Sequence, residues 1–499
     1  MKTLYHNATF FSMENPENCH EAVLCEDGMI TDTFHVAPEN IDCELVDLSG
    51  AFIFPGFIDS HTHSFEGGLY QNGADLSQCL SISDVLDVLR EAQPFGDMIF
   101  AWKFDENAIK EKRFPTKDEL NRLFPHTPLI LRRVDGHSCV INEEAIRMIR
   151  QNHPNLDFPT NGLLRALHND ISAHSFHKNL NFESVLQCYK TAEKIAIMNG
   201  HTTIHTMIGD AKDDFLHFSL LLEQLNDFII DFELYPQCFN IQSVIKVYDQ
   251  LKIKNRRIGG CILADGSFGS YTAAISQPYT DKGNKNNLGI LYQTSEFWND
   301  FFLQAKKDNL QVGVHCIGDR AILQVLKAIR QAKGKIRHQI IHCELVSDDM
   351  LNLLKAQNVF AVMQPMFDAY WGGEKGFYSK VLGVDRLKYL NRFNTLTQYG
   401  ITVTGGSDWY ITDLSALKGI NATINHQYPP ERLSNFEAVK LYTTNPALLT
   451  FEEKTKGHLL SGYKADMVCL DKNILTTKET SDVKVVKTIK NGKVVHCQL

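Results

Sequence analysis

Hydrophobic and polar residues alternate at both ends of the chain in short runs that are typical of β-strands. The runs cover residues 3–13, 21–25, 29–36, 43–48, 465–470 and 483–495. The last run contains Asn491-Gly492, a dipeptide that strongly favours a two-residue hairpin turn. Neither group of strands is long enough to bury a core alone. We therefore expect residues 1–53 and 451–499 to pack together as a small β-sandwich.

Between these ends, from residue 54 to residue 450, strand-like runs alternate with helix-like runs. This alternation is typical of a parallel sheet with crossover helices. Amphipathic segments such as residues 182–198, 321–332 and 348–357 have the pattern of helices that cover such a sheet. The strand-like runs cover residues 53–58, 202–205, 231–235, 258–264, 310–314, 339–341, 359–363 and 401–404. Eight such runs predict an α/β fold of the (β/α)8 TIM barrel type.

One interval of this central region is too long for a single strand and helix. It extends from about residue 65 to about residue 180 and contains a strand-like run of its own at residues 128–134. We therefore expect an insertion over the barrel mouth. The predicted domains are a β-sandwich from residues 1–53 and 451–499, and a barrel from residues 54–450 that carries this insertion.

Composition and charge limit the partners of the protein. The chain has 499 residues, a hydrophobic content of 43% and a formal net charge of −9, with no basic stripe that would favour nucleic acid or a membrane surface. No apolar run reaches the roughly 20 residues of a membrane helix. A small-molecule substrate fits these properties, and the sequence leaves homo-oligomer formation open. Because the 12 cysteines include no Cys-x-x-Cys pair and the N-terminus lacks a secretory pattern, we expect a reduced, cytoplasmic protein.

Two histidines follow the first strand-like run of the central region, in the segment PGFIDSHTH at residues 55–63. Alternate residues of an extended segment point the same way, so His61 and His63 can reach one metal ion. Alone, such a pair also occurs in ordinary loops. Later strand-like runs end in three further candidate ligands, namely His315, His342 and Asp408. Since the carboxyl ends of barrel strands converge on one mouth, these five residues can meet in space.

An ordered series of motifs carries a family resemblance over nearly the whole chain. The series includes DLSGAFIFPGFIDSHTH, RRVDGHSCVIN, LADGSFGSYTAA, VHCIGDRA, IIHCEL, GGSDW and GYKADMVCLD. In this order the segments resemble the branch of the amidohydrolase superfamily that includes N-substituted formamide deformylases. The resemblance implies a (β/α)8 barrel with a β-sandwich from both termini. It also implies a metal-dependent hydrolase that cleaves C–N bonds other than peptide bonds.

The resemblance assigns roles to the candidate ligands. His61, His63, His315, His342 and Asp408 match the metal-binding residues of the family, and this ligand set suits a divalent ion, above all zinc. Such an ion lowers the pKa of bound water from above 15 to about 7. Asp408 also matches the catalytic base, which takes a proton from the attacking water and gives it to the departing nitrogen.

Four other residues are assigned to the site with alternatives left open. His137, in DGHS, is predicted as a catalytic donor to the carbonyl oxygen, or else as an ordinary histidine of the insertion. Asp265, Gln364 and Trp371 are predicted to contact the substrate. The alternatives are a turn-forming role for Asp265 and simple packing for Trp371.

The family pattern is broken at the fourth strand-like run. Relatives commonly carry a lysine there that bridges two ions when it is carboxylated, but the segment RRIGGCILADGS has none. The absence of this bridge favours one ion over two. Cys261 could act as a ligand only if its side chain points into the barrel, and the sequence leaves open whether Cys261 or Asp265 enters the metal site.

Two further functions are compatible with the same pattern. The fold and a similar ligand set also support deamination of an amino-substituted ring. Alternatively, the chain could be a catalytically silent barrel that works as a binding protein. Retention of all four histidines and Asp408 argues against this last reading.

Overall fold

The computed structural model describes residues 2–39, 41–134, 136, 138–165, 167–209, 215–280, 286–334 and 336–498. The chain divides into two compact units. The main unit contains Met1–His63 and Glu193–Leu499, and the second unit contains Ser64–Ala192. The predicted insertion falls within this second unit. Among the described residues, no helix is both long enough and apolar enough to cross a membrane.

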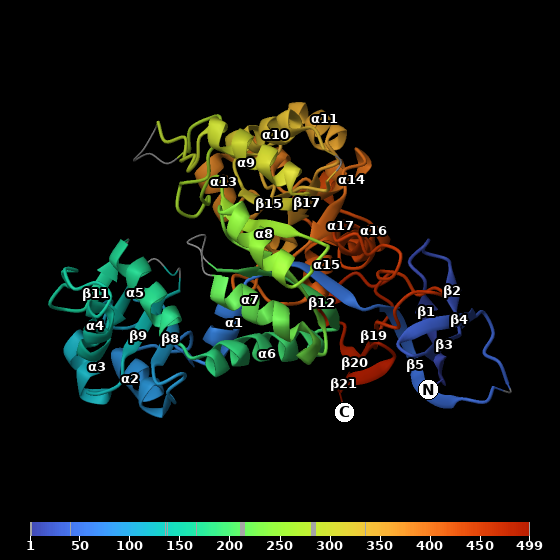
Figure 1. The fold of residues 1–499 in the computed structure, drawn as a ribbon, viewed down its shortest axis with the longest axis horizontal. Coiled ribbons are helices and arrows are strands. Elements are labelled where there is room, and N and C mark those ends of the chain that lie inside the picture. The colour runs from blue at the N-terminus through green and yellow to red at the C-terminus, as the bar shows by residue number, and fades with distance from the viewer. Residues whose placement is uncertain are drawn as a thin grey trace. The chain divides into compact units, whose positions relative to one another are not determined.

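The second unit is built on a five-stranded sheet with the order β11-β10-β9-β8-β7. Helices α2 to α5 surround this sheet (Figure 1). Helix α3 begins with a capping box, in which Thr116 and Glu119 satisfy each other's backbone N–H groups. The elements are α1 (Ser64–Gln71), β7 (Ala74–Asp75), α2 (Ile82–Glu91), β8 (Ile99–Phe104), α3 (Lys117–Leu123), β9 (Leu129–Arg133), β10 (Ser138–Ile141), α4 (Glu143–Arg150), β11 (Leu163–Arg165), α5 (Leu167–Lys178) and α6 (Phe182–Met198), which continues into the main unit.

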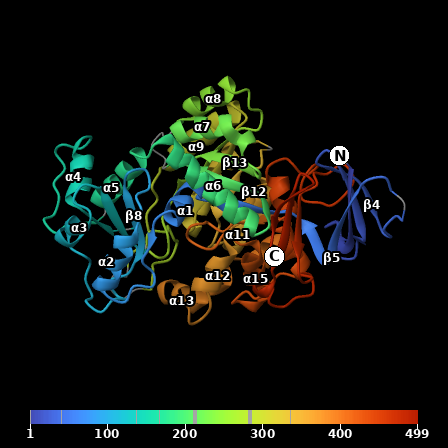
Figure 2. The same ribbon diagram turned by 90° about the horizontal axis from the view of Figure 1, so that it is seen from below.

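In the main unit, strands from both ends of the chain form one eight-stranded sheet with the order β21-β20-β19-β5-β1-β3-β4, and β2 pairs with β1. The N-terminal and C-terminal strands meet at β5, which pairs with β1 on one side and with β19 on the other (Figure 2). The strands are β1 (Lys2–Phe11), β2 (Cys19–His20), β3 (Ala22–Glu26), β4 (Met29–Phe34), β5 (Glu44–Pro55), β19 (Met467–Leu470), β20 (Val485–Lys490) and β21 (Lys493–Cys497).

The terminal strands share one hydrophobic core. Tyr5, Ile53, Met467 and Ile489 are among its buried residues, so neither end of the chain buries this core alone. The predicted hairpin at Asn491-Gly492 is confirmed, because both residues have positive φ values, 49° and 68°, and they join β20 to β21. The hydrogen bonds describe one continuous sheet, and the packing of two sheets as a sandwich stays a prediction.

The centre of the main unit contains eight parallel strands in two hydrogen-bonded sheets. One sheet has the order β13-β12-β6 and the other β14-β15-β16-β17-β18. The strands are β6 (Phe57–Thr62), β12 (His201–Ile208), β13 (Asp231–Pro236), β14 (Arg257–Leu263), β15 (Gln311–Cys316), β16 (Gln339–His342), β17 (Phe360–Met363) and β18 (Val403–Gly405). Each overlaps one of the eight predicted runs, and the predicted α/β class is confirmed.

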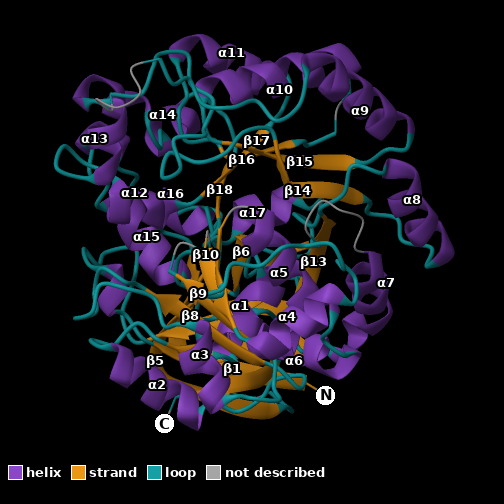
Figure 3. Cartoon of the chain, turned by 90° about the vertical axis from the view of Figure 1, so that its left-hand side faces the viewer, coloured by secondary structure: helices purple, strands orange, loops and turns teal. Residues whose placement is uncertain are grey.

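Helices follow these strands along the chain and lie outside them; α8 to α11 surround β14 to β17 in Figure 3. Several strands, including β6 and β15, are buried at every position, as expected for strands covered on both faces. The helices are α7 (Phe215–Gln224), α8 (Ile241–Gln250), α9 (Ser295–Lys307), α10 (Asp319–Ala332), α11 (Asp348–Ala356), α12 (Pro365–Trp371), α13 (Phe377–Leu382), α14 (Phe393–Gln398), α15 (Ala416–Ile424), α16 (Asn435–Lys440) and α17 (Thr444–Leu449).

The two parallel sheets are joined by hydrogen bonds along one of their two seams. The segment after β18 bonds to β6 and the residue after it, because Asp408 N donates to His61 O at 2.8 Å and His63 N donates to Trp409 O at 2.6 Å. At the other seam β13 lies beside β14, but no strand pairing joins them in the described part of the chain. The strand order is that expected for a barrel, and full closure of the barrel stays a prediction.

Candidate metal centre

Six potential ligands from five strands meet at the carboxyl ends of the parallel strands. Their ligand atoms form three overlapping groups, and within each group all atoms lie within 4.8 Å of one another. The groups are His61, His63 and Cys261; Cys261, His315 and His342; and His61, His342 and Asp408. The structure therefore brings together all five residues predicted as ligands, and it adds Cys261.

Strained backbone helps to direct two of these ligands. His342 has a φ of 69° and Asp408 a φ of 53°, in the left-handed region that residues other than glycine rarely adopt. Each such conformation costs on the order of 1–3 kcal/mol, which the surrounding structure must offset. The bond from Asp408 N to His61 O holds this turn against β6. Such strain is typical of functional sites.

Hydrogen bonds fix the rings of two histidines. His342 Nδ1 lies 2.6 Å from Gln364 Oε1, and His315 Nε2 lies 3.1 Å from the Gly266 carbonyl oxygen. Because carbonyl oxygens only accept, these ring nitrogens donate. The other nitrogens, His342 Nε2 and His315 Nδ1, are left without a proton and suit metal binding. Gln364 thus has a supporting position, and it is not among the residues that line the nearby cavity.

Two buried aspartates hold the backbone of the ligand segments. Asp59 Oδ1 accepts hydrogen bonds from the N–H groups of His61 and Ser407, each at 3.0 Å. Sequence reasoning missed Asp59, although it stands two residues before His61 in the same motif. Burial raises the pKa of Asp59 to about 6, and the hydrogen bonds oppose this shift.

Asp265 has a similar supporting position beyond His315. Its carboxylate accepts hydrogen bonds from the N–H groups of Ala274, Ile317 and Gly318 at 2.8 to 3.0 Å. Burial raises the pKa of Asp265 to about 6. Asp265 is not among the cavity-lining residues, and it belongs to none of the three ligand groups. The structure therefore places it as an anchor of the loop after His315.

The carboxylate of Asp408 lies between the first two histidines. Its Oδ1 is 3.2 Å from His61 Nε2 and 3.1 Å from His63 Nε2. Burial alone would raise the pKa of Asp408, but the interactions with both histidines hold it well below its usual range. Asp408 is therefore ionised at neutral pH and can act as a ligand or as a proton acceptor.

The donor atoms of this cluster fit a divalent metal ion. Both ring nitrogens of His61, and Asp408 Oδ1, are buried and have no hydrogen-bond partner outside the ligand cluster among the described residues. Buried polar atoms are normally satisfied, so this arrangement calls for a ligand. Imidazole, carboxylate and thiolate together form a donor set that zinc and similar ions prefer.

A cavity of about 560 Å³ opens beside the cluster. Its lining includes His63, Cys261, His315, His342 and Asp408, so the ligands face this space. Most of the other lining residues are apolar or aromatic, among them Phe268, Ile317, Phe367, Trp371, Tyr378 and Tyr410. The cavity has the size and character of a small-molecule site.

The outcome for the remaining predicted residues is mixed. Trp371 lines the cavity, as expected for a substrate contact. His137 lies outside the described residues. Sequence reasoning also missed Glu344, a cavity-lining residue in the HCEL motif whose exposed fraction is 1%. Burial raises the pKa of Glu344 to about 8, and the hydroxyl of Tyr378 opposes this shift.

Comparison with known proteins agrees with the fold and the site. The model of the amidohydrolase family matches residues 44–496. The chain therefore belongs to the amidohydrolase family and is a hydrolase of that superfamily. It is 27% identical to the Bacillus subtilis protein YtcJ, which is named as an amidohydrolase, over 99% of each chain. It is 22% identical to the N-substituted formamide deformylase of Arthrobacter pascens, over 97% of this chain and 96% of that one.

Solved structures show the same fold. A metal-dependent hydrolase from Pyrococcus horikoshii superposes with a TM-score of 0.82 at 23% identity, and the match covers 96% of this chain and 99% of that chain. A metal-dependent hydrolase from Pyrococcus furiosus gives a TM-score of 0.81 at 24% identity, with 95% of this chain and 100% of that chain covered. At these identities the likeness establishes the fold.

Proposed function

We propose that the protein is a metal-dependent hydrolase that cleaves a non-peptide C–N bond, of the linear amide or N-substituted formamide type. The observation that carries the proposal is the position of Asp408, whose Oδ1 lies 3.2 Å from His61 Nε2 and 3.1 Å from His63 Nε2 beside a largely apolar cavity. The similarity to the Arthrobacter pascens deformylase favours this bond type. We further propose that the two parallel sheets form a single barrel, and that the metal is zinc.

The residues of the cluster have different roles in hydrolysis. The histidines and Asp408 would hold a divalent ion, which when bound lowers the pKa of water and offers positive charge to the substrate carbonyl. Asp408 accepts a proton from the attacking water, since its low pKa keeps it ionised. It then donates this proton to the departing nitrogen, because an amine leaves poorly without one.

The cavity walls favour an apolar group on the substrate. Phe367 packs edge-on against Trp371, with ring centroids 4.8 Å apart, and both residues line the cavity. An alkyl or aromatic substituent on the amide nitrogen would bury its surface against these rings. The supporting bond between Gln364 and His342 keeps a neighbouring ligand in place.

A substrate screen tests the proposal. Zinc-loaded protein is incubated with formamides that carry alkyl or arylalkyl groups on nitrogen, with acetamides of the same amines, and with amino-substituted heterocycles. We expect release of an amine and formate, and no release in the Asp408→Asn variant. Release of ammonia from the heterocycles would instead identify a deaminase. No turnover of any compound by metal-loaded protein would indicate a binding protein.

A further inference from the structure

We infer that Cys261 bridges two divalent ions as a thiolate, in the segment where relatives commonly carry a lysine. The inference deepens the proposed function, because it rests on the metal dependence of the site. The sequence favoured one ion because it shows no bridging residue. The structure removes this premise, since Cys261 lies among the ligands and faces the cavity.

The histidines around Cys261 fall into two pairs, and a third group of His61, His342 and Asp408 joins one pair to the other. His61 and His63 form one group with Cys261, and His315 and His342 form another. Cys261 is the only residue that these two groups share, and its Sγ lies 3.6 Å from His315 Nδ1. Among the described residues, no group contains both His63 and His315. Six potential ligands, with Cys261 within reach of both histidine pairs, are enough to hold two neighbouring ions with one ligand between them.

The backbone of β14 is shaped to deliver this side chain. In the pairing with β15, Gly259 lies opposite Gly313 and Ile262 opposite Val314, so Gly260 and Cys261 are extra residues of a bulge. Bulges next to active sites commonly redirect a side chain. Gly259 and Gly260 both have a φ of 87°, a conformation that costs glycine little.

Space is also tight at both positions before Cys261. A Cβ atom on Gly259 would lie 2.2 Å from the carbonyl oxygen of Gly313. A Cβ atom on Gly260 would lie 2.1 Å from Met207 Sδ. A larger residue at position 259 would therefore push against the backbone of β15, whereas at position 260 the side chain of Met207 would have to move. The Gly-Gly pair permits the bulge, and the bulge sets the position of the cysteine that follows.

Thiolate chemistry fits the bridging position. Two cations a few ångströms apart repel each other, and a negative charge between them offsets part of this repulsion. On metal binding, the thiol of Cys261 releases its proton to solvent, and the sulfur shares its lone pairs between the two ions. Asp408 lies beside His61 and His63 and completes the first ion's ligands. His315 and His342 supply the second.

Cobalt titration of the chelator-treated full chain tests the assignment directly. We expect two Co²⁺ ions per chain and a near-ultraviolet thiolate-to-cobalt absorption band. The Cys261→Ala variant should bind one ion or fewer and lose the band. The matched control is Cys316→Ala, which removes a buried sulfur from the adjacent strand β15 that belongs to none of the ligand groups. This control should keep both ions and the band.

X-ray absorption of the zinc-loaded protein should show sulfur at about 2.3 Å and a second metal at about 3.5–4 Å. Saturation of the wild type with one ion, two ions without sulfur, or two ions in Cys261→Ala would each overturn the inference. Cys261→Lys should regain a second ion only when bicarbonate is present, without the sulfur band. Failure of this variant to bind a second ion would count against a bridge at residue 261.

The metal titration and the substrate screen can each refute one proposal without refuting the other. If the protein hydrolyses formamides with one bound ion, the bridge is wrong and the proposed function stands. If it binds two ions through Cys261 but releases no amine from any amide, the proposed function is wrong and the bridge stands.

Discussion

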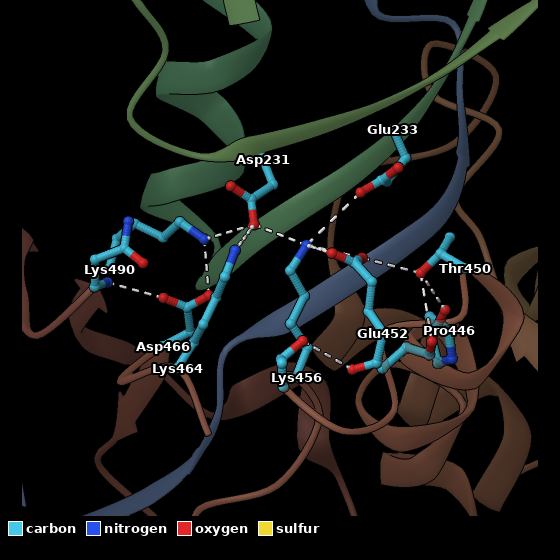
Figure 4. A network of polar contacts seen from close by, with 12 residues as sticks. Asp231, Glu233, Pro446, Thr450, Glu452, Lys456, Lys464, Asp466 and Lys490 are labelled. Atoms are coloured by element: carbon cyan, nitrogen blue, oxygen red, sulfur yellow. Dashed lines mark hydrogen bonds and ion pairs between the residues drawn. The ribbon is translucent and has the colours of Figure 1, made fainter. Parts of the chain in front are cut away.

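Two clusters of buried and partly buried polar side chains in the described part of the main unit differ in how the hydrogen-bonding and charge requirements of their atoms are met. The metal centre lies at the carboxyl ends of the parallel strands, around His61 at the end of β6. The other cluster, which we call the ionic network, surrounds Asp231 at the start of β13 (Figure 4). Through β12, Asp231 is level with Ile58, near the opposite end of β6.

In the ionic network every charge faces an opposite charge. Asp231 Oδ2 lies 2.7 Å from the Nζ atom of Lys456, 3.0 Å from that of Lys464 and 2.9 Å from that of Lys490. Lys490 also pairs with Asp466 at 2.7 Å, and Lys456 with Glu452 at 2.8 Å. These contacts join β13 to the C-terminal part of the chain and leave no charge for a ligand to satisfy.

In the metal centre, by contrast, the ring nitrogens of His61 and Asp408 Oδ1 have no hydrogen-bond partner outside the cluster of ligands among the described residues. Burial of polar groups without partners is costly, so selection would remove it unless a ligand completed the site. Satisfaction of polar atoms within the chain, rather than burial or charge, therefore separates a structural cluster from a binding site. The positions of the two clusters agree with the rule that functional sites of barrels lie at the carboxyl ends of the strands, whereas residues at the other end contribute to stability.

The sharpest test of this comparison is Asp408→Asn. Asparagine keeps the shape of the side chain but cannot accept the proton, so turnover should fall by a factor on the order of 10² to 10⁴. The midpoint of thermal unfolding should change little. Kinetics on the best formamide and scanning calorimetry measure the two effects. Turnover within about threefold of the wild type would assign the base to another residue.

In the ionic network we expect the opposite behaviour. Lys456 has an exposed fraction of 4% and contacts Asp231, Glu233 and Glu452. Lys456→Met therefore removes one cation from Asp231 and Glu233 and leaves Glu452 without its lysine partner. The free energy of unfolding should fall by about 3–5 kcal/mol. Turnover per folded molecule should stay near that of the wild type.

Urea denaturation checks this loss. The matched control is Lys454→Met, at an exposed position two residues away, which should change the unfolding free energy by less than about 0.5 kcal/mol. A loss for Lys456→Met no larger than that of the control would show that the network contributes nothing to stability.

The fold could be predicted where local patterns decide it. Each of the eight strands of the central sheets overlaps a strand-like run of the sequence, so their positions follow from the sequence within a few residues. The pairing of β5 with β19 joins Phe54 to Val468, and no local pattern specifies a contact over such a separation. The same holds for the seam between β13 and β14.

The site could be predicted where topology brings strand ends together. His61, His63 and Asp408 meet because parallel strands end on one side, which the order of elements implies. The position of Cys261 depends on a bulge, and the φ values of Gly259 and Gly260 that create it are not readable from the sequence. Asp265 and Gln364 were expected to contact the substrate. The structure instead shows their hydrogen bonds to the loop after His315 and to His342, and the sequence does not reveal these contacts.

Zinc should stabilise the metal centre without affecting the ionic network. At a free zinc concentration 100 times the dissociation constant, the folded state gains about 2.7 kcal/mol per site. His61→Ala should lose most of this gain, whereas Lys456→Met should keep all of it, although its starting stability is lower. Calorimetry with zinc and with a chelator measures the difference. An equal zinc response in wild type and His61→Ala would show that the ion binds elsewhere.

The smallest expected effect is the pH dependence that Asp231 gives to the ionic network. Burial would raise the pKa of Asp231, but the charges of Lys456, Lys490 and Lys464 outweigh this and hold it below its usual range. A carboxyl whose pKa is lower in the folded state stabilises the protein above its unfolded pKa of about 3.9, and this stability is lost as the pH falls. Urea midpoints of the chelator-treated protein, measured from pH 6 to pH 3, should therefore fall more steeply for the wild type than for Asp231→Asn. The control Asp300→Asn, at an exposed position of α9, should follow the wild type, and identical slopes for all three proteins would contradict the assignment of this acid sensitivity to Asp231.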